Sequence, residues 1–329
     1  MIKDMMRGFE LYQPVDLDNA LKLVDRFGKD SWILAGGNDS LDWFKDRVKH
    51  PRQVVDLGGV DELKGIRETA NGLEIGALTT LTEITQNPMV KEKFGLLADA
   101  AGHVASPQIR NAGTLGGNLC QDTRCWYYRA GLNCYRAGGN KCYADAPESM
   151  NREHCLFNAD RCVAVSPSDT APALVALDAE IKIRGVKGER MVKAEDFFIG
   201  PDIDITRMTV LKKNEILTAV VLPHTWAGAT FYFEKVADRK TWDFALVNIA
   251  AAIKESGGTI NDIRIACGGV ECKPRRLKVV EEVVKGSARN EETTILAGQS
   301  AIRGATPLNY NHFKIPLMEN LVKRAIRDA

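Results

Sequence analysis

Six of the eight cysteines in this 329-residue chain lie between Cys120 and Cys162. Cysteines gathered in this way favour metal binding or redox chemistry over structural disulfides in a cytoplasmic protein. Four thiolates around one centre suit either zinc or an iron–sulfur cluster. Structural zinc sites prefer cysteine pairs two to four residues apart. The spacing from Cys125, C-x8-C-x7-C-x12-C-x6-C, is wider and favours the larger cluster, while zinc stays open.

Two glycine-rich turns are the second candidate for chemistry. "AGGNDS" covers residues 35–40 and "RNAGTLGGN" covers residues 110–118. Glycines allow neighbouring backbone N–H groups to converge on an anion, and a pyrophosphate is the natural ligand. Neither turn has the GxGxxG or Walker pattern, so either one alone could be an ordinary tight turn. Together they predict a site for the two ends of a dinucleotide, without deciding between FAD and NAD.

The elements around these turns indicate how they are positioned. A short strand at 32–35 enters the first turn, and a helix at 91–104 leads into the second. A capping box of Thr80 and Glu83 begins another helix. Residues 119–162 show neither helical nor strand periodicity and form a long insertion loop. A loop of this length in a compact protein is expected to be functional.

The C-terminal part changes character after Pro223. Three expected strands are followed by three expected helices, which indicates a separate α+β domain. The strands cover 229–238, 244–254 and 263–270, and the helices cover 275–286, 291–304 and 315–329. The predicted fold class is therefore α+β. An α/β domain at 1–223, with an insertion at about 119–163, precedes a domain at 224–329 that has a three-stranded antiparallel sheet and a helix bundle.

Composition excludes several classes of partner. The formal net charge is +1, so no long-range field recruits nucleic acid or an anionic membrane. No apolar run approaches the length of a membrane span. The first residues lack the apolar stretch of a secretion signal, so a cytoplasmic location is expected.

Several segments together resemble one known family. "AGGNDSL", "IRNAGTLGGNL" and "SPSDTAPALVALDAEI" occur in this order. They resemble the FAD-binding subunit of the xanthine oxidase family of molybdenum hydroxylases. "FYFEKVADRKTWDFALVNIAAAI" and "IRIACGGVECKPRRLKVVEE" resemble its C-terminal domain. The resemblance covers almost the whole chain and implies a two-part FAD-binding domain of the PCMH type.

The resemblance implies which residues bind FAD. The first loop wraps the diphosphate, and Asp169 reaches the ribose or ribityl hydroxyls. Lys235 lies near the isoalloxazine ring, where a cation stabilises reduced flavin. The complete implied set is Ile33, Leu34, Ala35, Gly36, Gly37, Asn38, Asp39, Ser40, Val104, Thr114, Gly117, Asn118, Gln121, Asp169 and Lys235. Two alternatives apply if the resemblance is set aside. Asp169 or Ser168 would then cap a helix, and Lys235 would occupy an exposed strand position.

The cysteine segment resembles a subset of the family typified by 4-hydroxybenzoyl-CoA reductase. Members of this subset hold a [4Fe-4S] cluster in an inserted loop. "NLCQDTRC" and "CYRAGGNKC" look like that loop, and the implied ligands are Cys125, Cys134, Cys142 and Cys162. Cys155 is the alternative fourth ligand. Cys120, His154, Cys267 and Cys272 are interpreted as packing or loop residues.

The implied function is that of an oxidoreductase subunit without catalytic residues of its own. It passes electrons between an external carrier, such as a ferredoxin, and centres in two partners. These partners are a small [2Fe-2S] subunit and a large molybdenum-cofactor subunit, in a dimer of heterotrimers. The extra cluster favours reductive dehydroxylation of an aromatic, hydroxybenzoyl-CoA-like substrate. Oxidation of an aldehyde, purine or N-heterocycle is the alternative. A stand-alone flavoprotein oxidase and a non-catalytic zinc-binding interaction module are the competing classes.

Overall fold

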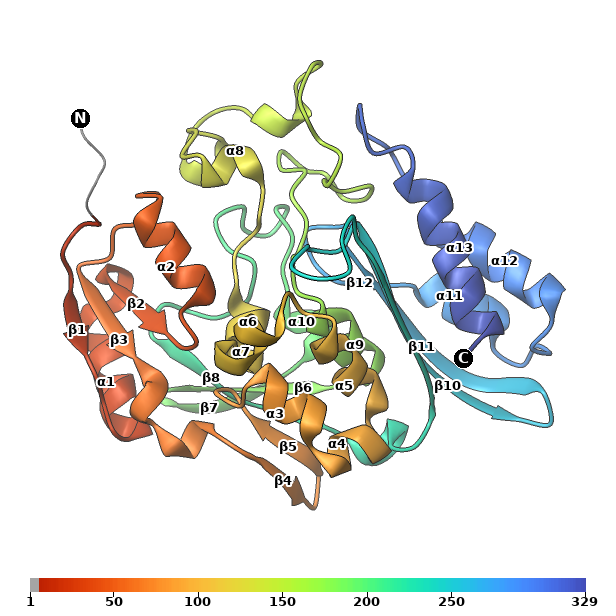
Figure 1. Cartoon of the computed structure of the whole chain (residues 1–329), viewed down its shortest axis with the longest axis horizontal. Coiled ribbons are helices and arrows are strands. Elements are labelled where there is room, and N and C mark those ends of the chain that lie inside the picture. The colour runs from red at the N-terminus through yellow and green to blue at the C-terminus, as the bar shows by residue number, and fades with distance from the viewer. Residues whose placement is uncertain (1–5) are drawn as a thin grey trace.

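The computed structural model describes residues 6–329, which form three sheets that follow one another across the molecule (Figure 1). The first sheet is parallel, in the order β1 (Glu10–Tyr12), β3 (Gln53–Asp56) and β2 (Ser31–Leu34). Helix α1 (Leu17–Phe27) buries its apolar face near this sheet, and Asp16 caps its first turn. Helix α2 (Asn38–Lys45) begins directly after the first glycine turn.

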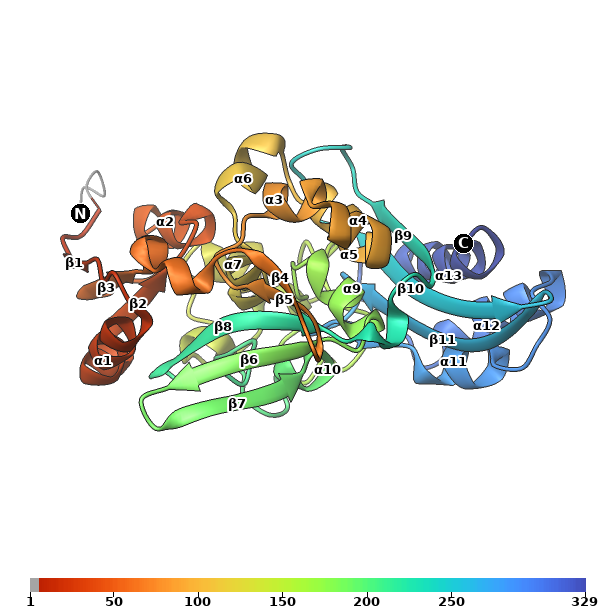
Figure 2. The same cartoon turned by 90° about the horizontal axis from the view of Figure 1, so that it is seen from below.

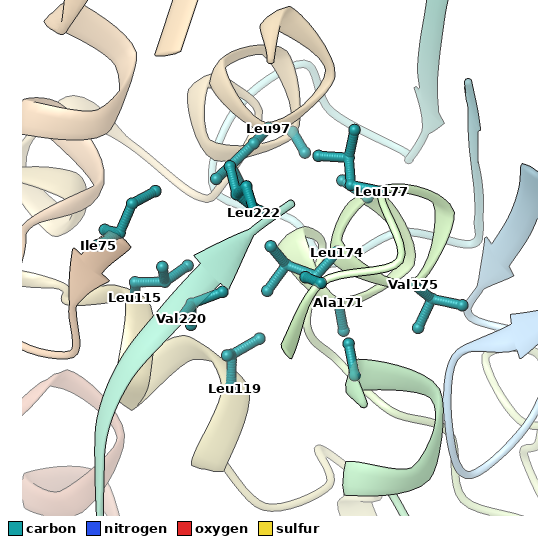
Figure 3. Close-up of a cluster of buried hydrophobic side chains, with 14 of the residues drawn as sticks. Ile75, Leu97, Leu115, Leu119, Ala171, Leu174, Val175, Leu177, Val220 and Leu222 are labelled. Carbon is teal, nitrogen blue, oxygen red and sulfur yellow. The ribbon is translucent and has the colours of Figure 1, made fainter. Parts of the chain in front are cut away.

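The second sheet is antiparallel and has five strands. Their order is β4 (Ile66–Thr69), β5 (Gly72–Gly76), β8 (Glu215–Leu222), β6 (Glu180–Gly185) and β7 (Gly188–Lys193). The helices packed around this sheet are α3 (Leu81–Gln86), α4 (Pro88–Lys93), α5 (Gly95–Gly102), α6 (Pro107–Ala112), α7 (Leu115–Cys120), α9 (Thr170–Ala176) and α10 (Ala194–Phe197). Most of them lie on one side of the sheet (Figure 2). Their apolar side chains form the largest core, in which Leu97 and Leu174 gather around Val220 and Leu222 (Figure 3).

The third sheet belongs to the C-terminal part of the chain. It is antiparallel, in the order β12 (Arg275–Arg276), β11 (Thr259–Gly268), β10 (Val247–Ser256) and β9 (Thr230–Val236). Helices α11 (Lys278–Val284), α12 (Glu291–Ala301) and α13 (Lys314–Arg327) pack on one face. Strand β10 serves two cores, because Ile249 and Ile253 face these helices while Ala250 and Ala252 face the core around α9. The small alanines allow α9 to approach the sheet closely.

The mixed α/β architecture is the one predicted, with three local differences. The C-terminal sheet has four strands rather than three, because two-residue β12 is too short for a sequence pattern. The single helix expected at 91–104 is two helices, α4 and α5, which separate at Phe94 (φ −140°). The second glycine segment is helical, since α6 and α7 flank Gly113.

The insertion is irregular, as expected, and contains only helix α8 (Trp126–Arg129) and two short 3-10 turns. It leaves α7, passes α2 and reaches the segment before α13 (Figure 1). Asn309 donates hydrogen bonds to the carbonyl oxygens of Ala146 and Pro147, which attaches the insertion to the C-terminal part. Among the helices formed by residues 6–329, none has the length and apolar character that a bilayer span requires.

Candidate functional site

The two glycine segments pack directly against each other. A Cβ atom at Gly36 would lie 2.1 Å from the carbonyl oxygen of Ala112 and 3.1 Å from the Cα atom of Gly113. Only glycine allows the two backbones to approach this closely. Asn38 adds a side-chain hydrogen bond to the carbonyl oxygen of Ile109 (3.2 Å). Two segments joined by a bond between residues 71 positions apart therefore form one wall.

The first glycine turn presents backbone amides at the N-terminus of α2. Gly37 precedes the helix in the left-handed conformation (φ 77°) and supplies no side-chain cap. The first amides of a helix have no partner within it, and the helix dipole adds partial positive charge there. This end of α2 is therefore suited to a phosphate group, which is the ligand class that the sequence predicts.

The second glycine segment does not form the second anion nest that was expected. The amide of Gly116 donates to the carbonyl oxygen of Ala77 (2.8 Å), and that of Gly117 donates to Oγ1 of Thr114 (3.1 Å). The amide of Asn118 donates to the carbonyl oxygen of Thr114 (2.9 Å). The two bonds to Thr114 form because this residue is the N-cap of α7, whereas the bond to Ala77 joins the segment to the turn after β5. The segment therefore supplies side chains and a backbone wall rather than free amides.

A cavity of about 1090 Å³ adjoins both segments. Its volume lies just above the usual range for small-molecule and cofactor sites. Of the residues implied for FAD, those that line it are Ile33, Ala35, Gly36, Gly37, Asn38, Asp39, Ser40, Val104, Thr114, Gly117, Asn118, Gln121 and Asp169. Leu34 and Lys235 do not line it. Leu34 packs in the apolar cluster around Trp43 because alternate residues of a strand face opposite sides.

Lys235 instead neutralises Asp169 at one end of this cavity. Its Nζ atom lies 2.6 Å from Oδ2 of Asp169 and also donates to the carbonyl oxygen of His103 (2.9 Å). The side chain of Asn248 donates to Oδ1 of Asp169 (2.8 Å). Strands β9 and β10 pair Lys235 opposite Asn248, so both side chains reach one carboxylate. Burial is the largest influence on this carboxyl group and raises the pKa of Asp169.

Asn118 is fixed by hydroxyl groups that were not among the expected site residues. Its Oδ1 atom accepts hydrogen bonds from Ser168 and Thr170, each at 2.6 Å. Ser168 also accepts a bond from the amide of Ala171 (3.2 Å) and so caps α9. Asp169 makes no capping bond, so the helix-capping alternative applies to Ser168. Both hydroxyl residues belong to the "SPSDT" motif in the sequence, but only the fold brings them into contact with Asn118.

A small cavity within the insertion, here called the cysteine cavity, is lined by all four cysteines that were implied as cluster ligands. They are Cys125, Cys134, Cys142 and Cys162. Cys155 does not line it, but Cys125 and Cys142 pack against the cluster that Cys155 forms with Ala144 and Val163. Of the two alternatives for the fourth position, only Cys162 lines the cavity with the other three, and its role as a ligand stays a prediction.

These thiols do not converge on a single point. Within residues 6–329, no group of three or more His, Cys, Asp or Glu side chains is arranged to hold a metal ion. Each thiolate of a four-iron cluster binds a different iron, so its ligands lie farther apart than the ligands of one ion. The cluster stays a prediction, and the shared lining is the observation on which it depends.

Two side chains beside the cysteine cavity have closer contacts than the sequence suggested. His154 is buried rather than a free loop residue, and its Nε2 atom lies 3.3 Å from Sγ of Cys125. Cys272, expected to be an ordinary thiol, is buried in the same apolar cluster as Cys162, and its neighbouring thiol group lowers the pKa of Cys162. Burial raises the pKa of Cys125 to about 11. No local pattern could reveal Cys272, because it comes from the C-terminal sheet region.

A third cavity, of about 430 Å³, lies between the other two. It shares Asp169 and Trp242 with the large cavity and shares Cys125 with the cysteine cavity. Two redox groups, one in each outer cavity, would therefore be separated by a single hollow. Such an arrangement is chemically suited to electron exchange between them.

Comparisons with known proteins agree along nearly the whole chain. Residues 7–225 match the family model for the FAD binding domain in molybdopterin dehydrogenase, and residues 232–329 match the CO dehydrogenase flavoprotein C-terminal domain. The carbon monoxide dehydrogenase medium chain of Hydrogenophaga pseudoflava is 29% identical over 326 residues, which cover 98% of this chain and 96% of that protein. The aldehyde oxidoreductase FAD-binding subunit PaoB of Escherichia coli (strain K12) is 32% identical over 301 residues, which cover 90% and 91%.

Solved structures give the same result. The carbon monoxide dehydrogenase from Hydrogenophaga pseudoflava that lacks the Mo-pyranopterin moiety aligns with a TM-score of 0.78 at 28% identity, covering 98% of this chain and 97% of that one. Quinoline 2-oxidoreductase from Pseudomonas putida 86 aligns with a TM-score of 0.77 at 26% identity, covering 99% and 98%.

Proposed function

The chain belongs to the family of FAD-binding medium subunits of molybdenum hydroxylases, and from this premise we propose that it conducts electrons through FAD and a [4Fe-4S] cluster. The cluster lies in the insertion, and the substrate is transformed on another subunit. The partners are a small [2Fe-2S] subunit and a large molybdenum-cofactor subunit. FAD exchanges electrons in pairs or singly, whereas iron–sulfur clusters pass them one at a time, so the chain joins the two kinds of chemistry.

The observation that carries the proposal is the position of the four cysteines. They line one cavity, although up to 37 positions separate them in numbering between Cys125 and Cys162. That cavity and the large cavity adjoin the same hollow through Cys125 and Asp169. A structural zinc site would not require this proximity to a flavin.

The large cavity offers FAD the groups that a dinucleotide requires. The amides at the start of α2 would hold the diphosphate, and Gly36 allows the second glycine segment to pack directly beside them. Asp169, with its charge balanced by Lys235, would accept hydrogen bonds from sugar or ribityl hydroxyls. Lys235 acts on the flavin end through Asp169 rather than by direct contact.

Two candidate reactions differ in the direction of electron flow through these centres. We favour outward flow, from a substrate oxidised on the large subunit to an external acceptor. The names of the relatives, which include dehydrogenases, an aldehyde oxidoreductase and a nicotine 6-hydroxylase, support oxidation. Inward flow from a ferredoxin, driving reductive dehydroxylation of a hydroxybenzoyl-CoA-like compound, is the second candidate. The cysteine insertion is the feature that favours it.

Cys134→Ser tests the cluster assignment. We expect the variant to lose most of its iron and acid-labile sulfide while its FAD content stays within about 20% of wild type, because Cys134 lines only the cysteine cavity. Iron, sulfide and flavin are measured on protein prepared without oxygen. Cys120→Ser is the matched control. This variant should keep its iron, because Cys120 lines the large cavity and not the cysteine cavity. Unchanged iron in Cys134→Ser would remove this residue from the ligand set.

A further inference from the structure

The cysteine cavity has an unbalanced positive lining. Among the described residues, Arg136 and Arg161 line it together with the cysteines and several tyrosines, and no aspartate or glutamate does so. Opposite charges attract strongly where little water separates them. The lining therefore suits an occupant with net negative charge, which a cluster held by four thiolates would carry.

Arg136 supplies a buried charge to this lining. Its side chain is 1% exposed. Its Nη2 and Nε atoms donate to Oδ1 of Asp122 (2.6 and 3.1 Å), and Nη1 donates to the carbonyl oxygen of Ile205 (2.8 Å). The carboxylate of Asp122 is 20% exposed and does not line the cavity. Arg136 thus lines the cavity together with the thiols, whereas its counter-charge on Asp122 does not line it and is more exposed to water.

Arg161 provides a natural comparison within the same cavity. It carries the same charge, but its side chain is 56% exposed and lies 3.7 Å from Asp160. Solvent and salt screen an exposed charge, whereas a buried charge keeps most of its field. The two arginines therefore differ in burial but not in charge.

We propose that Arg136 raises the reduction potential of the cluster by stabilising its reduced state. This role rests on the proposed function, since it requires the cluster. Reduction brings one electron, and so one negative charge, into the cavity. That electron would come from reduced flavin, which releases its N–H protons to solvent as it is oxidised, while the cluster would gain only the electron. A buried cation lowers the free energy of the more negative state, because net charge is one of the factors that set cluster potentials.

The consequence concerns the direction of electron flow. A cluster whose reduced state is stabilised accepts electrons from the flavin more readily than the same cluster would without the buried cation. Arg136 therefore favours flow from the large cavity to the cysteine cavity. This is the outward direction, which the names of the relatives also support.

Redox titration followed by electron paramagnetic resonance tests the role on the full chain loaded with iron and FAD. Arg136→Gln should shift the cluster midpoint to more negative potential, because the buried charge is lost. Asp122→Asn should shift it to more positive potential, because the counter-charge is lost. Arg161→Gln should change it little. A purely structural role would not produce shifts of opposite sign, and the flavin midpoint in each sample serves as an internal reference.

The outcomes separate this role from the cluster assignment. If wild-type protein carries iron but Arg136→Gln and Arg161→Gln have the same cluster midpoint, the role of Arg136 is overturned while the cluster assignment stands. A negative shift of the cluster midpoint in Asp122→Asn would have the same meaning. Wild-type protein without iron would overturn the cluster and the role together. If Arg136→Gln fails to retain iron, Arg136→Lys decides in its place: it keeps the charge and should stay near the wild-type midpoint, and a large negative shift would contradict the proposal.

Discussion

Lys314 helps to attach the cysteine insertion to the C-terminal part of the chain, although it belongs to no sequence motif identified above. It is fully buried at the first position of α13. Its Nζ atom donates to the carbonyl oxygens of His154 (3.0 Å) and Gly269 (2.8 Å). It thereby fastens the cysteine insertion to the C-terminal sheet. Burial lowers the pKa of Lys314 to about 7, since the charged form loses solvation.

Lys314 should make stability depend on pH. Its pKa falls from 10.5 in the unfolded chain to about 7 in the folded chain, so the unfolded state binds more protons between these values. Stability should therefore rise as pH increases from 7 towards 10, and the destabilising effect of charging the buried amine is fully present below pH 7. In Lys314→Met the part of the stability increase that Lys314 causes should disappear. Urea unfolding midpoints at pH 7 and pH 9 measure the increase in each protein. Equal increases in wild type and Lys314→Met would contradict the lowered pKa of Lys314.

At the scale of elements, one carboxylate connects α2 to the insertion. Oδ1 of Asp39 lies 2.6 Å from Nη2 of Arg129 and 3.2 Å from Nη2 of Arg124. Its Oδ2 atom accepts from the amide of Asp122 and from Trp43, each at 3.3 Å. Asp39 was expected to contact FAD. It lines the large cavity, but its carboxylate bonds to the insertion, so the helix that begins at the first glycine turn also holds the cysteine loop.

Asp39→Asn should loosen the insertion without unfolding the domain. The loss of charge-assisted hydrogen bonds to two arginines is worth about 1.5–3 kcal/mol. Trypsin should therefore cleave within residues 119–163 roughly tenfold or more faster, because the local opening equilibrium shifts. Cleavage sites are read by mass spectrometry. Asp42→Asn is the control: Asp42 is 55% exposed and lies 3.6 Å from Arg124, so its loss should change little. Equal cleavage in both variants would argue against the connection.

At the scale of the whole molecule, a buried ion pair joins the two parts of the chain. Asp169 lies before α9, whereas Lys235 and Asn248 lie on β9 and β10. The Asp169 and Lys235 side chains are only 4% and 6% exposed. The alanine face of β10 packs against the same region. The position of the C-terminal sheet relative to the large cavity therefore depends on this pair.

Lys235→Met should destabilise the protein by about 3–5 kcal/mol, because removal of one partner leaves a buried charge uncompensated. The free energy of unfolding in urea measures the loss. The double variant Asp169→Asn with Lys235→Met should recover part of it, since no charge then remains. Lys240→Met, on the exposed loop after β9, should stay within about 0.5 kcal/mol of wild type. Equal effects of the two lysine substitutions would contradict the role of the pair.

The sequence by itself determined the local chemistry of this protein. Glycine at positions 36 and 37, the order of the motifs and the clustered cysteines predicted a dinucleotide site beside a cysteine site, because each depends on residue type and near neighbours. Helix ends with local signals, such as the capping box at Thr80, were equally predictable, and the structure contains that capping box.

Only the tertiary structure decided which of these residues act together. It placed Cys162 rather than Cys155 in the lining of the cysteine cavity, packed Cys272 with Cys162, and paired Lys235 with Asp169 outside the lining of the large cavity. Such pairings depend on sheet register and on packing between distant segments. No short-range pattern specifies them, because the free energy that fixes them arises only when the three sheets and the insertion assemble.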